Sequence, residues 1–242
     1  LAAGLATVVV PVAPWRSVFL PVLLAIGIVT LAFHFLSEEA YAVEVPRLEI
    51  RATVTRLLGR GDNLLFLLAY TFFAFAWQAT TGFLPTYFRL GKGFSPEIAN
   101  LSFAILFGMG ILMKPLAGTL GDRFRHDLVC IAVAELAAVS LAVMVFARTS
   151  ILAIVAVVGF ASGLMAFPPV MQAYLMDNLP DSSYGGDLGA MKSVYIGIGS
   201  TGPAYVGFVA ANSSYDVAFG GVVCALVVSG GLIWRGSVAN RS

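Results

Sequence analysis

Residues 128–147 read Leu-Val-Cys-Ile-Ala-Val-Ala-Glu-Leu-Ala-Ala-Val-Ser-Leu-Ala-Val-Met-Val-Phe-Ala, an apolar stretch with one charged residue, Glu135. A helix needs about 20 mostly apolar residues to cross the hydrocarbon core of a bilayer. The apolar run is continuous and shows no alternation of apolar and polar residues, which favours a helix over a strand of a membrane β-barrel. This stretch therefore predicts a transmembrane helix.

Six segments of the chain pass the same test of length and apolar character. A seventh segment, residues 217–234, is shorter but uncharged and rich in Gly and Val. The apolar residues 1–10 would form the tail of an eighth, so we expect the chain to be a fragment that begins inside a helix. The sequence predicts an all-α integral membrane protein with about seven complete transmembrane helices. The six segments are residues 17–36, 63–88, 96–118, 128–147, 151–175 and 187–211.

The composition of the whole chain agrees with a membrane protein. Hydrophobic residues make up 59% of it and charged residues only 11%, and the mean hydropathy is +0.91. Soluble domains carry about 25% charged residues, so this chain has too few to solvate a surface. The net charge of +1 indicates no nucleic-acid partner. Cys130 and Cys224 lie in apolar stretches without metal-ligand spacing, so we expect neither a metal site nor a cofactor.

Residues 37–62 form the one long charged stretch and mark the predicted domain boundary. We expect residues 1–36 to be the end of one transmembrane bundle, residues 37–62 a linker, and residues 63–242 a bundle of six helices. Ile50, Val54, Leu57 and Leu58 recur at helical spacing, which is typical of a short helix on the membrane surface. A solvated linker with an incidental apolar stripe remains the alternative.

The distribution of basic residues between the two sides of the membrane predicts the orientation of the chain, because Lys and Arg collect in cytoplasmic loops. Eight basic residues lie on one predicted side and four on the other, which places the linker, the loop at residues 121–127 and the C-terminus in the cytoplasm of a multi-pass cell-membrane protein. The eight are Arg47, Arg51, Arg56, Arg60, Arg123, Arg125, Arg235 and Arg241; the four are Arg16, Arg89, Lys92 and Arg148.

One motif lies between two predicted spans and carries opposite charges at a helix end. Gly118 and Gly121 would allow helices to approach closely, and Asp122 and Arg123 follow them directly. The motif resembles the cytoplasmic loop motif G-x-L-a-D-R-x-G-R-R of the major facilitator superfamily. That resemblance implies that Asp122 and Arg123 act as a conformational latch between the two halves of a transporter. The motif reads Gly118-Thr119-Leu120-Gly121-Asp122-Arg123-Phe124-Arg125-His126.

The motif departs from the family pattern at three positions. Arg125 stands where the family has glycine, and His126 and Asp127 replace its two basic residues. Other stretches also resemble the family, namely Trp15-Arg16 before the sixth helix, residues 83–88 at the end of the seventh and Gly202-Pro203 in the eleventh. The resemblance implies that the chain holds the end of helix five, helix six, the central linker and helices seven to twelve.

Two charged residues within the predicted spans, Lys114 and Glu135, each have two possible roles. Lys114 lies near the predicted cytoplasmic end of its helix, where its amine would either reach the lipid headgroups or join the latch. Glu135 is the acidic residue deepest within a span. It would either pair structurally with an arginine or take part in proton coupling.

Candidate substrate-contacting residues follow from the family's cavity, which helices seven, eight, ten and eleven line. Trp77 and Gln78 lie midway along the seventh helix, where an amide beside an indole could contact a solute. The alternative is an interhelical hydrogen bond from Gln78 and ordinary packing of Trp77. Further candidates of the same kind are Gln172, Tyr174, Tyr195 and Tyr205.

Proline and glycine patterns give two further expectations. Pro168-Pro169 interrupts the tenth helix and predicts a kink, which either gates the cavity or is static. Residues 197–202 match the dinucleotide pattern G-x-G-x-x-G, but no strand precedes them and they lie in an apolar span. Their small side chains instead predict a surface for close helix contact.

The function that the sequence favours is secondary active transport of a small-molecule solute by alternating access, with a co-transported ion or proton as a further partner. A membrane sensor, scaffold or truncated remnant that keeps the helices is the alternative. No P-loop, H-E-x-x-H or G-x-S-x-G motif is present, so we do not expect an enzyme.

Overall fold

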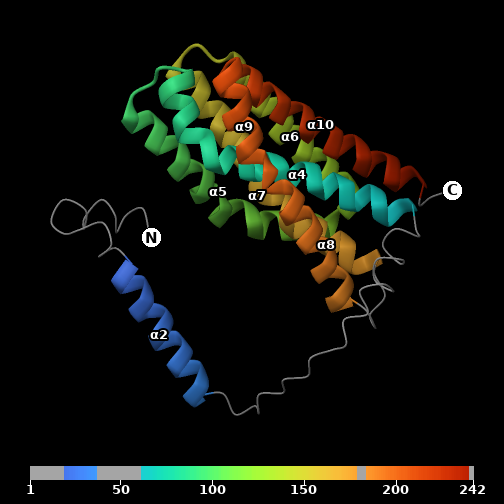
Figure 1. The fold of residues 1–242 in the computed structure, drawn as a ribbon. Coiled ribbons are helices and arrows are strands. Elements are labelled where there is room, and N and C mark those ends of the chain that lie inside the picture. The colour runs from blue at the N-terminus through green and yellow to red at the C-terminus, as the bar shows by residue number, and fades with distance from the viewer. Residues whose placement is uncertain (1–18, 37–60, 179–183, 240–242) are drawn as a thin grey trace. The chain divides into compact units, whose positions relative to one another are not determined.

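The computed structural model describes residues 19–36, 61–178 and 184–239, which are mostly helical (Figure 1). Residues 1–10 and most of the predicted linker, including its surface helix, lie outside the described residues. The helices are α2 (Phe19–Leu36), α4 (Gly61–Thr86), the π-helix η2 (Tyr87–Gly91), α5 (Pro96–Arg123), α6 (His126–Phe146), α7 (Ser150–Asn178), α8 (Tyr184–Gly199), α9 (Thr201–Asn212) and α10 (Tyr215–Ala239).

Within the described residues, six helical segments are long and apolar enough to cross a membrane. The shorter apolar helix α2 brings the total to the expected seven. The all-α fold predicted from the sequence is therefore confirmed. The six segments are Leu64–Gly91, Pro96–Arg123, His126–Phe146, Ser150–Asp177, Gly186–Asn212 and Tyr215–Val238.

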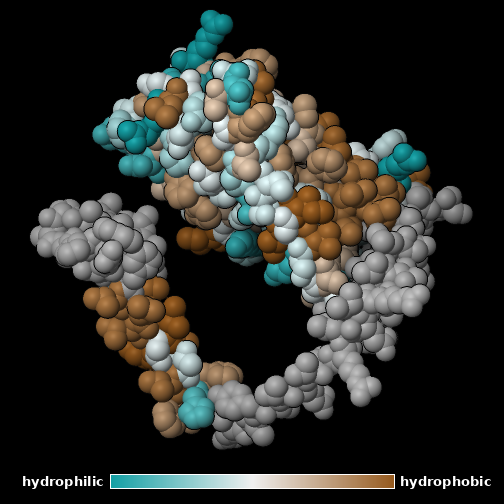
Figure 2. Space-filling model, in the orientation of Figure 1, coloured by the Kyte–Doolittle hydropathy of each residue, from teal (hydrophilic) through white to brown (hydrophobic). Residues whose placement is uncertain are grey.

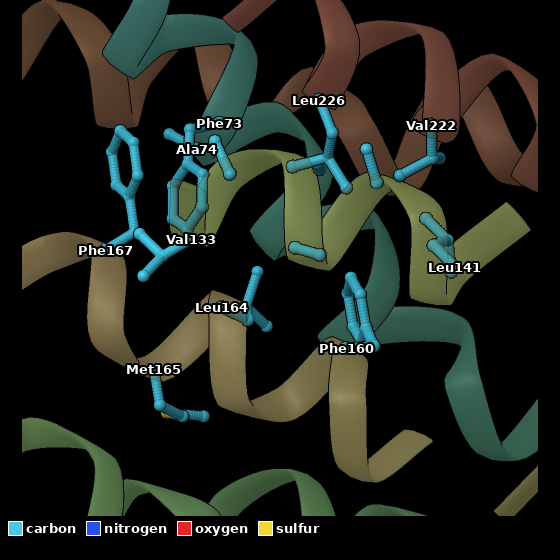
Figure 3. Close-up of a cluster of buried hydrophobic side chains, with 14 of the residues drawn as sticks. Phe73, Ala74, Val133, Leu141, Phe160, Leu164, Met165, Phe167, Val222 and Leu226 are labelled. Carbon is cyan, nitrogen blue, oxygen red and sulfur yellow. The ribbon is translucent and has the colours of Figure 1, made fainter. Parts of the chain in front are cut away.

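The chain divides into two compact units, Leu1–Arg47 with α2 and Leu48–Ser242 with the other helices. In the second unit α6 packs on α7 and α10, α4 packs on α8, α9 and α10, and α5 packs on α7. Buried side chains from α4, α6, α7 and α10 meet between these helices, as the close-up in Figure 3 shows. Phe73 of α4 and Phe167 of α7 stack there with ring centroids 3.8 Å apart.

Glycines bring pairs of helices into close contact. A Cβ atom on Gly163 of α7 would lie 2.8 Å from the backbone nitrogen of Ala137 on α6. A Cβ atom on Gly202 would lie 3.0 Å from the backbone nitrogen of Ala79, and one on Gly199 would lie 2.8 Å from the Cβ of Ala74. Gly199 and Gly202 thus pack on α4, which confirms the predicted role of the small residues in this stretch.

Several helix boundaries differ from those expected, such as the end of α10 at Ala239, and two of the differences bear on the candidate site and the motif. The segment predicted at residues 187–211 is split into α8 and α9 at Ser200. Pro203 has no N–H to donate to the carbonyl of Gly199, and its ring crowds that carbonyl, so the helix breaks one turn before the proline. In addition, α5 continues to Arg123, so Asp122 and Arg123 lie on the last helical turn and only Phe124 and Arg125 connect α5 to α6.

The outer surface of the described helices is largely apolar. Figure 2 shows hydrophobic side chains over α2 and over much of the bundle, while hydrophilic residues gather near the end with the α4–α5 connection. Large side chains such as Ile111, Phe146 and Ile151 are mostly exposed in the absence of lipid. Such a surface is stable only in contact with a bilayer or another apolar surface.

Candidate functional site

A pocket of about 420 Å³ lies among α4, α5, α7 and α8. The midpoint of the span Leu64–Gly91 falls between Trp77 and Gln78, so these two lining residues lie at mid-depth of the bundle. Tyr70 lies about two helical turns before Trp77 on α4, towards the end of the bundle that also holds Arg123. The pocket extends in that direction. Its lining residues are Tyr70, Phe73, Ala74, Trp77, Gln78, Thr81, Lys114, Pro168, Tyr195 and Ile196.

Aromatic rings form much of the wall of this pocket. Tyr70 of α4 and Tyr195 of α8 stack with ring centroids 3.9 Å apart and planes 8° apart. The side chains of Tyr195 and Gln172 both interact with the hydroxyl of Tyr70. Phe73 lies 6.5 Å from Trp77 between ring centroids. The wall therefore offers planar apolar surface.

Two polar side chains of the lining also use their hydrogen-bond donors within the protein. The Nε2 atom of Gln78 donates to the carbonyl oxygen of Ile196 at 3.0 Å. The hydroxyl of Thr81 donates to the carbonyl of Trp77 at 2.8 Å. The interhelical hydrogen bond weighed for Gln78 is thus present, although the same residue also lines the pocket.

Lys114 provides the cation of the pocket. It lies on α5 about 7 Å from the midpoint of the span Pro96–Arg123, given the helical rise of 1.5 Å per residue. Its Cε atom is 3.8 Å from a Cβ atom placed on Gly110, one turn nearer the start of the helix. The side chain therefore runs towards mid-depth and away from Asp122, rather than towards the headgroups at that end.

The structure brings some of the predicted substrate residues together and leaves others apart. Trp77, Gln78 and Tyr195 line the pocket, as does Pro168. Gln172 supports Tyr70 from outside the lining. Three other predicted residues lie elsewhere: Tyr174 packs on Phe66 at 4.7 Å between ring centroids, Tyr205 packs on Phe75 at 5.3 Å, and Pro169 is a helical residue of α7 outside the lining.

Several lining residues were missed from the sequence, although a signal for them exists. Tyr70, Ala74, Trp77 and Thr81 follow one another at i, i+4, i+7 and i+11, which places them on one face of a helix. Extending the face of Trp77 in both directions would have found them. Lys114 was expected to act at the membrane edge because its position along the helix does not reveal the direction of its side chain.

The motif at the end of α5 is partly packed and partly open. Gly121 is buried, and a Cβ atom on it would lie 3.0 Å from the ring of His126, whereas Gly118 faces open space. Asp122 and Arg123 are exposed. Neither forms an ion pair with another residue of the described part of the chain. Both charges are therefore available to a further partner.

The three residues that depart from the family pattern make local contacts. Arg125 pairs with the buried Asp127 at 2.6 Å, and this hydrogen bond raises the pKa of the Arg125 guanidinium above its ordinary value. His126 Nδ1 lies 2.8 Å from a carboxylate oxygen of Asp177 at the end of α7. The first contact is local to the α5–α6 turn, and the second connects that turn to α7 within the same bundle.

Glu135 lies on α6 against α10. Its carboxylate occupies the space beside Gly230, where a Cβ atom would collide with it. Among the described residues it forms no ion pair with an arginine.

A second polar cluster lies at the opposite end of the bundle. The hydroxyl of Tyr87 donates a hydrogen bond of 2.6 Å to Asp216, and the amine of Lys92 lies 2.9 Å from the same carboxylate. Lys92 also donates to the carbonyl of Val145 at the end of α6. The cluster joins η2, α6 and α10. No group of three or more His, Cys, Asp or Glu side chains gathers as metal ligands would anywhere in the described ranges.

Comparison with known proteins identifies the family of this bundle. The Major Facilitator Superfamily sequence model matches residues 1–200 and 66–240. Among solved structures, a single-residue variant of the Escherichia coli fucose:proton symporter FucP superposes with a TM-score of 0.71 at 19% sequence identity, over 92% of this chain and 56% of that one. The chain thus spans about half the length of that protein. No curated protein sequence matches significantly. On the family match, which covers nearly all of its length, the chain belongs to the Major Facilitator Superfamily.

Proposed function

We propose that this chain is part of a secondary active transporter that moves a small solute across the membrane by alternating access. The observation that carries the proposal is the pocket at mid-depth among α4, α5, α7 and α8. A solute site at the bilayer midplane is what alternating access requires, since rigid-body rocking of two bundles around that site exposes it to each side in turn. The symporter whose fold this chain shares is named for fucose and protons, and a small solute with a co-transported ion fits the same scheme.

The arrangement of the chain follows from this proposal. Residues 1–36 would end the first bundle, residues 37–62 would form a cytoplasmic linker, and residues 63–242 would form the second bundle. The exposed helix faces support it: α5 and the span Gly186–Asn212, formed by α8 and α9, are the least buried of the six spans, so they have the most surface left to contact another bundle. The linker, Asp122 and the C-terminus would share the cytoplasmic side.

Asp122 and Arg123 would act as a latch between the two bundles on that side. Both are exposed, and both lie on the last turn of α5 beside the open face of Gly118. Opposite charges at this position favour one conformation only if their partners approach in that conformation alone. That neither forms an ion pair with another described residue supports such a role.

Glu135 is the candidate for ion coupling within the described spans. Its carboxylate lies in an apolar span without an arginine partner in the described part of the chain. A carboxylate in such a place exchanges a proton more readily than one held in an ion pair. Structural packing against Gly230 is the competing role.

Solute uptake into proteoliposomes tests the proposed function. The full-length protein that contains this chain should accumulate at least one solute from a chemically diverse panel when an ion gradient is imposed, and collapse of that gradient should abolish accumulation. A membrane sensor or scaffold would accumulate none under any gradient, and that result would overturn the proposal.

A further inference from the structure

Among the described residues, Lys114 is the one charged residue in the lining of the mid-depth pocket. Gln78 and Thr81 each donate a hydrogen bond to a backbone carbonyl. Lys114 forms no ion pair or hydrogen bond with another described residue. An ammonium group offers three donors and no acceptor. The pocket therefore presents a surplus of donors carrying one positive charge.

This surplus charge restricts what can bind. No carboxylate from the described residues lines the pocket. Lys114 is exposed rather than buried, and an ammonium at this depth is stabilised by an anion that reaches it. A ligand with one negative charge would neutralise it, whereas a dianion such as a phosphate monoester would leave one charge unmatched among these lining residues. The complementary head group is a monoanion that accepts hydrogen bonds.

The remainder of the lining determines the body of the ligand. Tyr70, Phe73, Trp77 and Tyr195 contribute aromatic surface, and Ala74, Pro168 and Ile196 contribute aliphatic surface. Such walls favour a planar apolar group, because ring contacts add to the gain from burial. The volume of about 420 Å³ lies within the usual range of small-molecule sites.

We propose that this pocket binds a small aromatic monocarboxylate, whose carboxylate pairs with Lys114 while its ring lies against the aromatic wall of α4 and α8. The inference rests on the proposed transport function in one respect only, namely that the bound solute is the one transported. Lys114 is thereby assigned to solute recognition, through an amine that reaches mid-depth next to Gly110 rather than the membrane edge.

Binding to the purified full-length protein tests this site with a series of probes that share one ring. Equilibrium dialysis of radiolabelled phenylacetate gives its dissociation constant, and competition gives those of the neutral phenylacetamide, the cationic 2-phenylethylammonium and the ring-free acetate. Phenylacetate should bind at least tenfold more tightly than each of the other three, because it alone satisfies both the charge and the aromatic wall. Equal binding of phenylacetamide and phenylacetate, or binding of none of the four, would overturn the proposal.

Variants of Lys114 separate its charge from its packing. Lys114→Gln should weaken phenylacetate binding at least tenfold and leave phenylacetamide binding unchanged within about twofold, and Lys114→Arg should retain the preference for the acid. Lys192→Gln is the matched control, because Lys192 lies on α8 outside the pocket lining. Persistence of the acid preference in Lys114→Gln would contradict the assignment.

Uptake measurements distinguish a failure of the site from a failure of the transport function. Binding of phenylacetate that depends on Lys114, without uptake of phenylacetate into proteoliposomes, supports the site and contradicts transport of its ligand. Uptake of another solute by a protein that does not bind phenylacetate supports transport and overturns the proposed ligand class.

Discussion

Gln78 on α4 donates a hydrogen bond to the carbonyl oxygen of Ile196 on α8, and the same carbonyl accepts the backbone N–H of Ser200 at 2.9 Å. Ser200 is the residue at which the span divides into α8 and α9. The side chain of Gln78, at the edge of the pocket, therefore binds the last turn of α8, where the backbone hydrogen bonds of that helix end. The helix that carries Tyr195 is fixed relative to α4 by this contact.

Replacing Gln78 with leucine should lower the free energy of unfolding by about 0.6 kcal/mol, the average for interhelical hydrogen bonds in a membrane protein. The loss stays small because the Ile196 carbonyl keeps the N–H of Ser200. Thermal unfolding in detergent measures the change. Ser193→Ala serves as the control, since that hydroxyl bonds only the carbonyl of Gly189 on its own helix. A loss above about 2 kcal/mol would show that Gln78 has a larger structural role.

Gly163→Ala should destabilise the bundle by about 1–3 kcal/mol, the usual cost of overpacking. The added methyl would press on the backbone of α6 at Val133 and Ala137, where neither helix can yield without moving. Gly231→Ala is the matched control, because a Cβ atom there meets nothing within 4 Å. The melting temperatures of the two variants provide the comparison. Equal stability of both would contradict the close contact between α6 and α7.

Tyr87→Phe should cost about 1 kcal/mol, the typical net contribution of one hydrogen bond. The ring would keep its stacking on Phe219 at 4.0 Å between centroids, while the hydroxyl contact to Asp216 is lost. In a double-mutant cycle with Asp216→Ala, the two changes should show a coupling energy of at least about 0.5 kcal/mol. Strict additivity in chemical denaturation would mean that the hydroxyl and the carboxylate do not interact.

Asp122→Asn should slow transport and shift the balance between outward-facing and inward-facing states, while leaving solute affinity within a few-fold. Asp122 lies at the end of α5 and outside the pocket lining, so its charge acts on conformation rather than on the solute. Initial uptake rate and equilibrium binding are measured side by side. Glu97→Gln, which removes an exposed carboxylate at the other end of α5, should change neither. Normal transport by Asp122→Asn, or a defect mainly in binding, would exclude the latch.

The sequence was sufficient for the spans because a bilayer imposes one simple requirement, a long apolar helix. The predicted segment at residues 128–147 agrees with α6 (His126–Phe146) to within two residues at each end. The break at Ser200 was missed because the apolar pattern continues across it, although Pro203 carries the signal. The π-helix at Tyr87–Gly91 has no comparable signal in the apolar pattern.

The pocket was predicted only in part, because side-chain direction depends on neighbouring helices. Trp77 and Gln78 could be found from their depth, and Tyr195 from its helix. Lys114 could not be assigned to the pocket, since its position along α5 does not show that its side chain runs back past Gly110, where α7 also packs. Met165 extends from α7 towards α5 at the same place (Figure 3).

Sided accessibility of Thr81 tests alternating access most directly, because this residue lines the pocket at mid-depth. The measurement is the rate at which a membrane-impermeant thiol reagent modifies Thr81→Cys in vesicles of either orientation. The full-length protein would carry Ala in place of Cys130 and Cys224, the two native cysteines of this chain. Alternating access predicts modification from both faces, with the two rates changing in opposite directions when Asp122→Asn is added. Modification from one face only, with or without Asp122→Asn, would contradict it.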